Sequence, residues 1–301
     1  MRNSKSSRGA AIMLALWALF LLSALVISWA LDINSRLALS SEATRMLRAE
    51  AVACSGTEVA LNPTTKPGSP NLRGQLNNGA TYEARITGEG GRIDLNWVVS
   101  SPVVVELLRK YLENKGIDLN ERDLMIDSLQ DWVSPNVGLH SLNAPPESDD
   151  YHPAHAPLGR VDELKKVAGW AEFTSAPGWD DDFTVNSRTG IDMAWASRDV
   201  LLALPGMTPD LVDRFLQIRQ GPDGIDGTED DAPIKSLDDI RAILGLNPPA
   251  IKLLQPFLAP NTPVPIFRVV SIGTAGKSRR TVQMVFQRLG VGAQVMTWKE
   301  F

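Results

Sequence analysis

The side chains best suited to chemistry lie in one short stretch, residues 223–231, which has the sequence Asp-Gly-Ile-Asp-Gly-Thr-Glu-Asp-Asp. Five of these nine residues are acids, and the two glycines permit tight turns. Calcium binds oxygen ligands on loops of this kind. Carboxylates this close together repel one another unless a cation or water screens them. The stretch is therefore a calcium site or a solvated acidic loop, and its candidate ligands are Asp223, Asp226, Glu229, Asp230 and Asp231.

A second group of acids is a weaker candidate for metal binding. It consists of Asp131, Glu147, Asp149 and Asp150, most of which lie on a long irregular loop between residues 134 and 160. A further run of three acids, 180–182, is expected to form a solvated turn.

Other chemistries find little support in the sequence. His140, His152 and His155 lie on the same irregular loop, where no regular structure would fix them as zinc ligands. Residues 273–278, Gly-Thr-Ala-Gly-Lys-Ser, end like a phosphate-binding loop, but Ser271 stands where that pattern needs glycine. A strand pattern follows instead of a helix, so we expect a hairpin. No nucleophile–base set is evident, and we predict that the protein is not an enzyme.

The element that begins the chain is an apolar stretch. From Ala10 to Leu31 there are 22 residues without a charge, a proline or a glycine. As a helix this stretch would reach about 33 Å, enough to cross a bilayer. Three basic residues precede it and the acid Asp32 follows, which predicts a cytoplasmic N-terminus. No glycine or proline occurs between Ala10 and Ser55, so an amphipathic helix is expected to continue over 32–61.

Strand patterns flank a helical block. Apolar and polar residues alternate over 82–87, and a second short extended piece is expected over 92–96. Further strands are predicted over 266–272, 281–288 and 294–301. Between them the signal is helical, with helix starts predicted at Ser101-Pro102 and at Asn120. The predicted organisation is a long helix, a strand domain built from 75–96 and 262–301, and an all-α domain, 97–261, inserted into it.

The helical block contains an internal repeat. Residues 197–209 align with residues 236–248 at a constant offset of 39. Each unit has a serine cap, a helix, a glycine that ends it, and then a threonine or asparagine cap with proline at the next helix start. This pattern is typical of helix–hairpin–helix units.

The start of the chain resembles a type IV prepilin leader. A basic leader, residues 1–9, ends at Gly9, and the apolar run begins at Ala10, so the resemblance implies cleavage between these two residues. A secretory signal peptide would have a shorter apolar run, and a plain membrane anchor is the remaining alternative. Most pilins and pseudopilins carry glutamate as the fifth mature residue, where this chain has Leu14. The family that typically lacks this glutamate is the large minor pseudopilin of type II secretion, general secretion pathway protein K.

Several short motifs occur in the order found in that family. They are Gly91-Arg92-Ile93-Asp94-Leu95-Asn96, Asp131-Trp132-Val133-Ser134-Pro135-Asn136, Glu147-Ser148-Asp149-Asp150-Tyr151, Asp162-Glu163-Leu164, Val185-Asn186 with Leu204-Pro205-Gly206, and Trp298-Lys299-Glu300. Ser134 and Asn136 replace acids that are usual in the family.

The resemblance implies both a fold and a function. It implies a pilin-like α/β (α+β) fold with a long N-terminal helix on a small antiparallel sheet, and calcium sites in the helical domain. It also implies a subunit of the bacterial inner membrane, with most of the chain in the periplasm, that caps the tip of the secretion pseudopilus and primes its assembly for protein export. The implied partners are other minor pseudopilins, the major pseudopilin and the prepilin peptidase.

The alternative function is a membrane-tethered helix–hairpin–helix protein that binds DNA, as in competence. Such hairpins offer the backbone of a Gly-x-Gly turn to phosphates, with basic residues around it. Here the segments 206–208 and 245–247 lack the second glycine, acids follow the first hairpin, and the net charge is −5. These features favour hairpins used for packing, and we predict no nucleic-acid partner.

Overall fold

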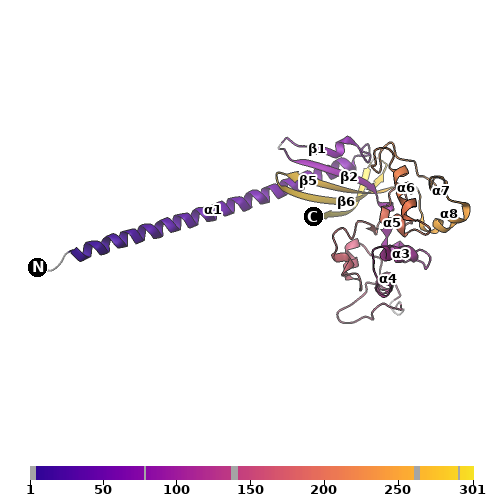
Figure 1. Cartoon of the computed structure of the whole chain (residues 1–301), viewed down its shortest axis with the longest axis horizontal. Helices are drawn as coiled ribbons and strands as arrows, with labels where there is room; N and C mark the ends of the chain where they lie inside the picture. The colour runs from indigo at the N-terminus through magenta and orange to yellow at the C-terminus, as the bar shows by residue number, and fades with distance from the viewer. Residues whose placement is uncertain (1–4, 78, 137–141, 261–264, 291) are drawn as a thin grey trace.

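The computed structural model describes residues 5–77, 79–136, 142–260, 265–290 and 292–301. A single helix, α1 (Lys5–Leu61), projects from a head that contains a sheet and a helical block (Figure 1). The helix ends at Leu61, as predicted, and the large apolar side chains between Ile12 and Leu31 are exposed. Within the described chain one helix, Gly9–Leu61, is long and apolar enough to cross a membrane.

The sheet is antiparallel and has five strands in the order β1-β2-β5-β6-β7. The strands are β1 (Arg73–Gln75), β2 (Thr81–Gly88), β5 (Ile266–Ala275), β6 (Ser278–Leu289) and β7 (Gly292–Glu300). Residues 273–278 comprise the end of β5, the two-residue turn 276–277 and the start of β6, which confirms the predicted hairpin. Because Gly88 at the end of β2 pairs with Phe267 at the start of β5, the intervening chain leaves and re-enters the sheet at neighbouring strand ends.

The last turns of α1 pack against one face of this sheet, on β5, β6 and β2. The helix approaches very closely at Gly273, where a Cβ atom would collide with the carbonyl oxygen of Ala49. Ala60, Ile86 and Phe286 belong to the apolar core that this packing buries. The fold class predicted for this part of the chain, a long helix on a small antiparallel sheet, is confirmed.

The block between β2 and β5 is built mainly of short helices around a separate, larger core. Its helices are α2 (Leu95–Val98), α3 (Val105–Asn114), α4 (Leu119–Val133), α5 (Arg198–Ala203), α6 (Pro209–Arg219), α7 (Leu237–Leu244) and α8 (Pro248–Leu254). Two short strands, β3 (Ile93–Asp94) and β4 (Phe183–Thr184), pair in parallel. Short 3-10 helices are η1 (Pro70–Leu72), η2 (Glu89–Gly91), η3 (Val161–Lys166), η4 (Phe173–Ser175) and η5 (Gln255–Phe257). The buried aromatic rings of Tyr111, Trp170 and Phe183 lie at the centre of this core.

The internal repeat gives the four helix starts correctly, but α5 ends at Ala203, before Gly206, so the predicted glycine end of the first unit was wrong. Ser197, Thr208, Ser236 and Asn247 each cap a helix, since each side chain accepts a hydrogen bond from a backbone N–H group in the first turn. Proline follows Thr208 and Asn247 as the first helical residue. Gly245 ends α7 in the left-handed conformation that glycine adopts readily.

Three other local predictions were wrong. Regular helix α3 begins at Val105, because Ser101 starts a turn that precedes it. Helix α4 is capped by Asp118, whose Oδ1 accepts from the N–H of Glu121 at 3.0 Å, so Asn120 lies inside the first turn. The extended piece predicted over 92–96 is only β3, because Asp94 caps α2 immediately afterwards.

Candidate functional site

Three of the five predicted calcium ligands lie together on the loop between α6 and α7. Asp223, Asp230 and Asp231 each offer a carboxylate oxygen, and these oxygens lie within 4.8 Å of one another. The loop turns tightly here, with positive φ angles at Gly224 and Gly227. Carboxylate oxygens at this spacing can bind a hard cation such as calcium.

Hydrogen bonds within the loop orient these three carboxylates. Asp223 accepts from the N–H of Ile225 at 2.7 Å, and Asp231 accepts from the N–H of Gly227 at 2.5 Å. The hydroxyl of Thr228 donates to Asp230 at 2.7 Å. That hydrogen bond lowers the pKa of Asp230, whereas partial burial raises the pKa of Asp231. A cation near Asp231 would offset this cost of burial.

The other two predicted ligands point elsewhere. Asp226 forms an ion pair with the buried guanidinium of Arg219, with N···O distances of 2.8 and 2.9 Å. Arg219 also donates to the carbonyl groups of Met193 and Ala196, so Asp226 completes a buried network. Glu229 is exposed, and its nearest cation is the Nζ of Lys66 at 3.5 Å.

The weaker group of acids is not gathered in the same way. Asp131 is buried near the end of α4, and Glu147 contacts the Nε2 of His155 at 2.9 Å. Among the residues that the structure describes, Asp223, Asp230 and Asp231 form the group of acids placed to hold a metal ion. The remaining members of the weaker sets are Asp149, Asp150 and His152, which are exposed, and His140, which lies outside the described residues.

Residues 180–182 form a turn, as predicted, but only Asp181 is exposed, and Asp180 and Asp182 are half-buried. Asp182 accepts hydrogen bonds from the hydroxyl groups of Tyr111 at 2.9 Å and Ser197 at 2.6 Å. Asp180 pairs with the ammonium group of Lys299 on β7 at 2.9 Å. Asp180 and Asp182 therefore link segments that are far apart in the sequence. The run of three acids in the sequence did not indicate these contacts.

A buried charge cluster joins the sheet to the helical block. Glu89 is fully buried and binds the guanidinium of Arg268 on β5 through both oxygens, at 2.8 and 2.9 Å. It also contacts Arg92 at 3.2 Å and accepts from the hydroxyl of Thr184 at 2.6 Å. Arg268 donates in addition to the carbonyl oxygen of Phe183 at 3.0 Å.

The electrostatics of this cluster favour ionised groups. Burial alone would raise the pKa of Glu89, but Arg268 and Arg92 outweigh it and hold that pKa below its usual value. Burial lowers the pKa of Arg92 to about 10, so this group stays charged at neutral pH. The cluster was not found from the sequence, which assigned no role to Glu89. It holds the helical block in a fixed position against the sheet.

Trp195 packs where the sheet, the block and the acidic loop meet. A Cβ atom at Gly88 would collide with its indole ring, and one at Gly91 would collide with its backbone. The indole also lies against Gly227 of the acidic loop. Glycine at these three positions therefore allows Trp195 to bring the loop up to the end of β2.

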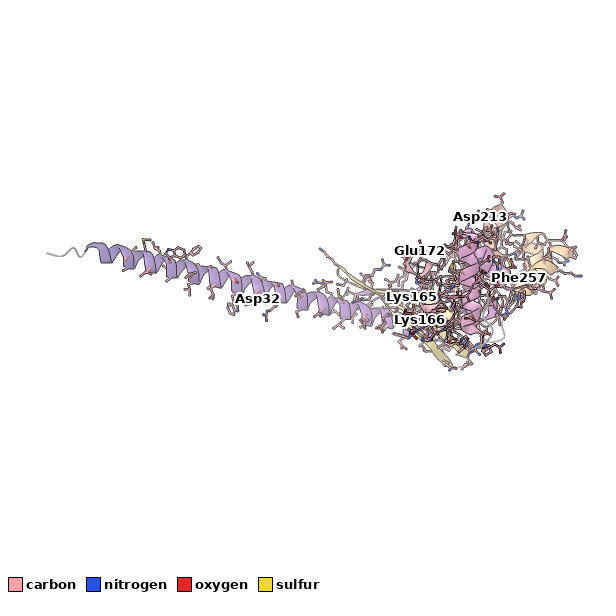
Figure 2. All side chains as sticks on the ribbon, turned by 90° about the horizontal axis from the view of Figure 1, so that it is seen from below. Asp32, Lys165, Lys166, Glu172, Asp213 and Phe257 are labelled. Carbon is pink, nitrogen blue, oxygen red and sulfur yellow. The ribbon has the colours of Figure 1, made fainter. Side chains whose placement is uncertain are left out.

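Helix α1 presents a different kind of surface. Leu14, at the position where glutamate would be expected in most pilins, has an exposed side chain. Past the apolar stretch, Asp32 and Arg36 form the first ion pair, at 2.9 Å. In Figure 2 Asp32 lies on α1 far from the head, which contains Asp213 and Phe257.

These features define a class of structure. A long N-terminal helix whose last turns lie on a small antiparallel sheet is the pilin-like fold, here with a helical block between β2 and β5. The chain is similar to a chain in the crystal structure of the GspK-GspI-GspJ complex from the type 2 secretion system of enterotoxigenic Escherichia coli. The similarity has a TM-score of 0.59 at 15% sequence identity and covers 90% of this chain and 99% of that chain. At this identity it establishes the fold. No family model matches the sequence, and no curated protein matches it.

Proposed function

We propose that this protein is a minor pseudopilin, of the general secretion pathway protein K type, that caps the tip of a type II secretion pseudopilus and primes its assembly. The observation that carries this proposal is the position of the helical block. The block lies at the end of the head that is farthest from the start of α1 (Figure 1). In a fibre of parallel α1 helices, a subunit stacked above this one would meet the block.

Leu14 supports the same position. In the pilin family the glutamate at this place pairs with the N-terminal amine of a neighbouring subunit. Leu14 provides no carboxylate, and an unpaired amine in a bilayer or fibre core is costly. A subunit that is first in the fibre has no earlier subunit whose amine it must neutralise.

The proposal includes processing and location. A prepilin peptidase would remove residues 1–9 and leave Ala10 as the N-terminus, with α1 still attached. The apolar stretch would then lie in the inner membrane and the head in the periplasm. Mass spectrometry of the mature protein tests this, since an intact leader or a cut after Leu31 would contradict it.

We further propose that the two helix pairs α5–α6 and α7–α8 are helix–hairpin–helix units used for packing and not for DNA. Arg198 on the first pair forms an ion pair with Asp213 at 2.7 Å, so a phosphate would have to compete with this carboxylate. Val212, Phe215 and Leu244 from these helices are buried in the core of the block. The role of the protein is then structural, without catalysis.

Calcium binding at Asp223, Asp230 and Asp231 belongs to the same proposal. A bound ion would fix the loop that packs on Trp195, at the junction of the sheet and the block. Calcium would in this way stabilise the distal end of a periplasmic subunit. The residues that would hold it are three, and not the five that the sequence suggested.

Assembly with companion minor pseudopilins tests the proposed function. The mature protein in detergent is mixed with two other minor pseudopilins from the same organism. A stable complex with one copy of each supports a tip complex. Filaments formed by this protein alone, or tight and salt-sensitive binding to DNA, would overturn the proposal.

A further inference from the structure

The end of the head nearest the apolar stretch carries a cluster of cations, the basic collar, which we define as Arg45, Arg48, Lys277, Arg279 and Arg280. We propose that the basic collar binds the anionic headgroups of the membrane in which α1 is anchored. This inference rests on the proposed membrane placement of α1. It assigns a lipid-binding surface to a part of the molecule that has no role in the tip contacts described above.

Contacts between α1 and the β5–β6 turn bring the collar together. A Cβ atom at Gly276 would lie 3.3 Å from the Cδ of Arg45, and the Nη2 of Arg280 lies 3.7 Å from the sulfur of Met46. Ser278 donates to Glu42 of α1 at 2.8 Å. The β5–β6 turn is therefore held against the segment of α1 from Glu42 to Met46. Three members of the collar, Arg48, Lys277 and Arg279, are exposed.

The collar has a strong excess of positive charge. Two carboxylates lie near these cations: Glu42, which is bound by Arg45, and Glu300 on β7, which lies opposite Val282 of β6. Hydrogen bonds from Arg45 and Ser278 lower the pKa of Glu42, so it is ionised and neutralises one cation. Five cations less these two carboxylates leave three positive charges at this end of a chain whose net charge is −5. Positive charge is thus concentrated at the membrane-facing end of an acidic protein.

The level of the collar on α1 places it above the headgroup layer. Arg45 follows Leu31 by 14 residues, which is about 21 Å along the helix. The headgroup layer extends roughly 5–7 Å beyond the hydrocarbon. The remaining gap of about 15 Å is about two Debye lengths at physiological salt, so tilt of α1 and the reach of the long side chains must close part of it. Once lysine and arginine side chains are within a Debye length of the surface, they attract anionic lipids.

A lipid is favoured over a neighbouring pilin helix because the two would use different faces of α1. Leu39 and Leu47 are exposed on α1 at the level of the collar. At about 100° per residue they lie on roughly the opposite side of the helix from Arg45. The apolar face is thus available for neighbouring helices while the collar faces the membrane. The collar would hold the head against the bilayer before the subunit is handed to the fibre.

The test uses the full chain inserted in vesicles of phosphatidylcholine, with or without phosphatidylglycerol. Acetylation of the Lys277 ammonium group is followed by mass spectrometry, and exposed Lys252 on α8, at the far end of the head, is the internal control. We expect acetylation of Lys277 to slow by roughly fivefold in the anionic vesicles. This factor corresponds to the attraction of about one basic side chain to an anionic membrane surface. The rate at Lys252 should not change, and salt should restore the rate at Lys277.

Two charge-reversal variants provide a matched comparison. Arg279→Glu with Arg280→Glu should abolish the protection of Lys277. Lys235→Glu with Arg241→Glu makes the same change in net charge at the far end and should leave the protection intact.

The possible failures are distinguishable. If alkaline washing removes the chain from the vesicles, the proposed membrane placement of α1 is wrong. If the chain stays inserted and Lys277 reacts equally fast in both kinds of vesicle, the collar does not bind anionic lipid. Protection that appears only when companion pseudopilins are added would also overturn the proposal, and would assign the collar to an acidic protein partner.

Discussion

Glu89 has no exposed surface and lies between two guanidinium groups, so its removal should be costly. Changing Glu89 to Gln keeps the shape of the side chain but leaves Arg268 buried without its counter-charge. Breaking a buried pair in this way costs about 3–5 kcal/mol. We expect a loss of this size in the free energy of unfolding, measured by chemical denaturation of the full chain in detergent.

The control for Glu89 is Glu83, an exposed carboxylate that pairs with exposed Arg73 at 2.8 Å. Glu83→Gln should cost less than about 1 kcal/mol. The effect at Glu89 should also depend on pH. Because the folded state lowers its pKa, the stability that Glu89 contributes is complete above its unfolded pKa of about 4.3 and is lost as the pH falls through the folded value. An unchanged difference between wild type and Glu89→Gln in strong acid would contradict this account.

Substitutions in the acidic loop, residues 223–231, should distinguish the proposed calcium ligands from Asp226, which forms an ion pair with Arg219. Chelation should lower the melting temperature of the wild-type protein, because Asp223, Asp230 and Asp231 would again repel one another. Changing Asp230 and Asp231 to Asn should remove the dependence on calcium. Changing Asp226 to Asn should instead destabilise the protein with or without calcium, because it leaves Arg219 buried and unpaired.

Differential scanning fluorimetry with calcium and with chelator measures all three proteins. A melting temperature of the wild type that does not respond to chelator would leave a solvated acidic loop as the better description. A loss of calcium response in Asp226→Asn without a lower baseline would mean that Asp226 is a ligand after all.

At the scale of elements, the close contact between α1 and β5 depends on Gly273. A Cβ atom there would collide with the backbone of Ala49 and crowd that of Ala53, which cannot move without shifting α1. Gly273→Ala should therefore lower the free energy of unfolding by about 1–3 kcal/mol. Gly292→Ala on β7 is the matched control, since nothing lies within 4 Å of its Cβ position. Equal effects of the two substitutions in chemical denaturation would show that the helix does not sit this close.

Local signals in the sequence were sufficient to predict the starts of helices that have a side-chain N-cap. Ser197, Thr208, Ser236 and Asn247 bond to backbone groups only three residues away, so a window of a few residues contains the whole interaction. The same holds for the β5–β6 hairpin, whose partners are adjacent in the chain. The long helix followed from the absence of glycine and proline between Ala10 and Ser55.

The junction between the sheet and the block could not be predicted, because its partners are distant in sequence. Glu89 and Arg268 are 179 residues apart, and Asp180 and Lys299 are 119 apart. A charge in a polar stretch has the same local pattern whether it is exposed or buried against such a partner. The pairing of Asp226 with Arg219 spans only 7 residues, but the sequence does not indicate which of five acids the arginine selects.

At the scale of the whole molecule, the head is divided along its length. The sheet and α1 form the part that a pilin fibre would share, and the helical block lies beyond them (Figure 1). Ion pairs of Glu89 with Arg268 on β5 and of Lys299 on β7 with Asp180 fix the block to the sheet. The block should therefore act as a rigid obstacle and not as a loosely tethered domain that could swing away from an incoming subunit.

This rigidity leads to a prediction about the number of copies in each fibre. If the block prevents another subunit from stacking above it, a fibre can contain one copy, at its tip, however much protein is made. Isolated pseudopili analysed by quantitative mass spectrometry should then keep a constant ratio of this protein to fibre number when its expression is raised several-fold. The major pseudopilin, raised in the same way, is the control and should lengthen the fibres. Leu14→Glu supplies the missing carboxylate without touching the block, so we expect it not to increase the number of copies. Incorporation that rises in proportion to expression, in the wild type or in Leu14→Glu, would place the protein in the shaft, because only there can each new copy find a subunit above and below it.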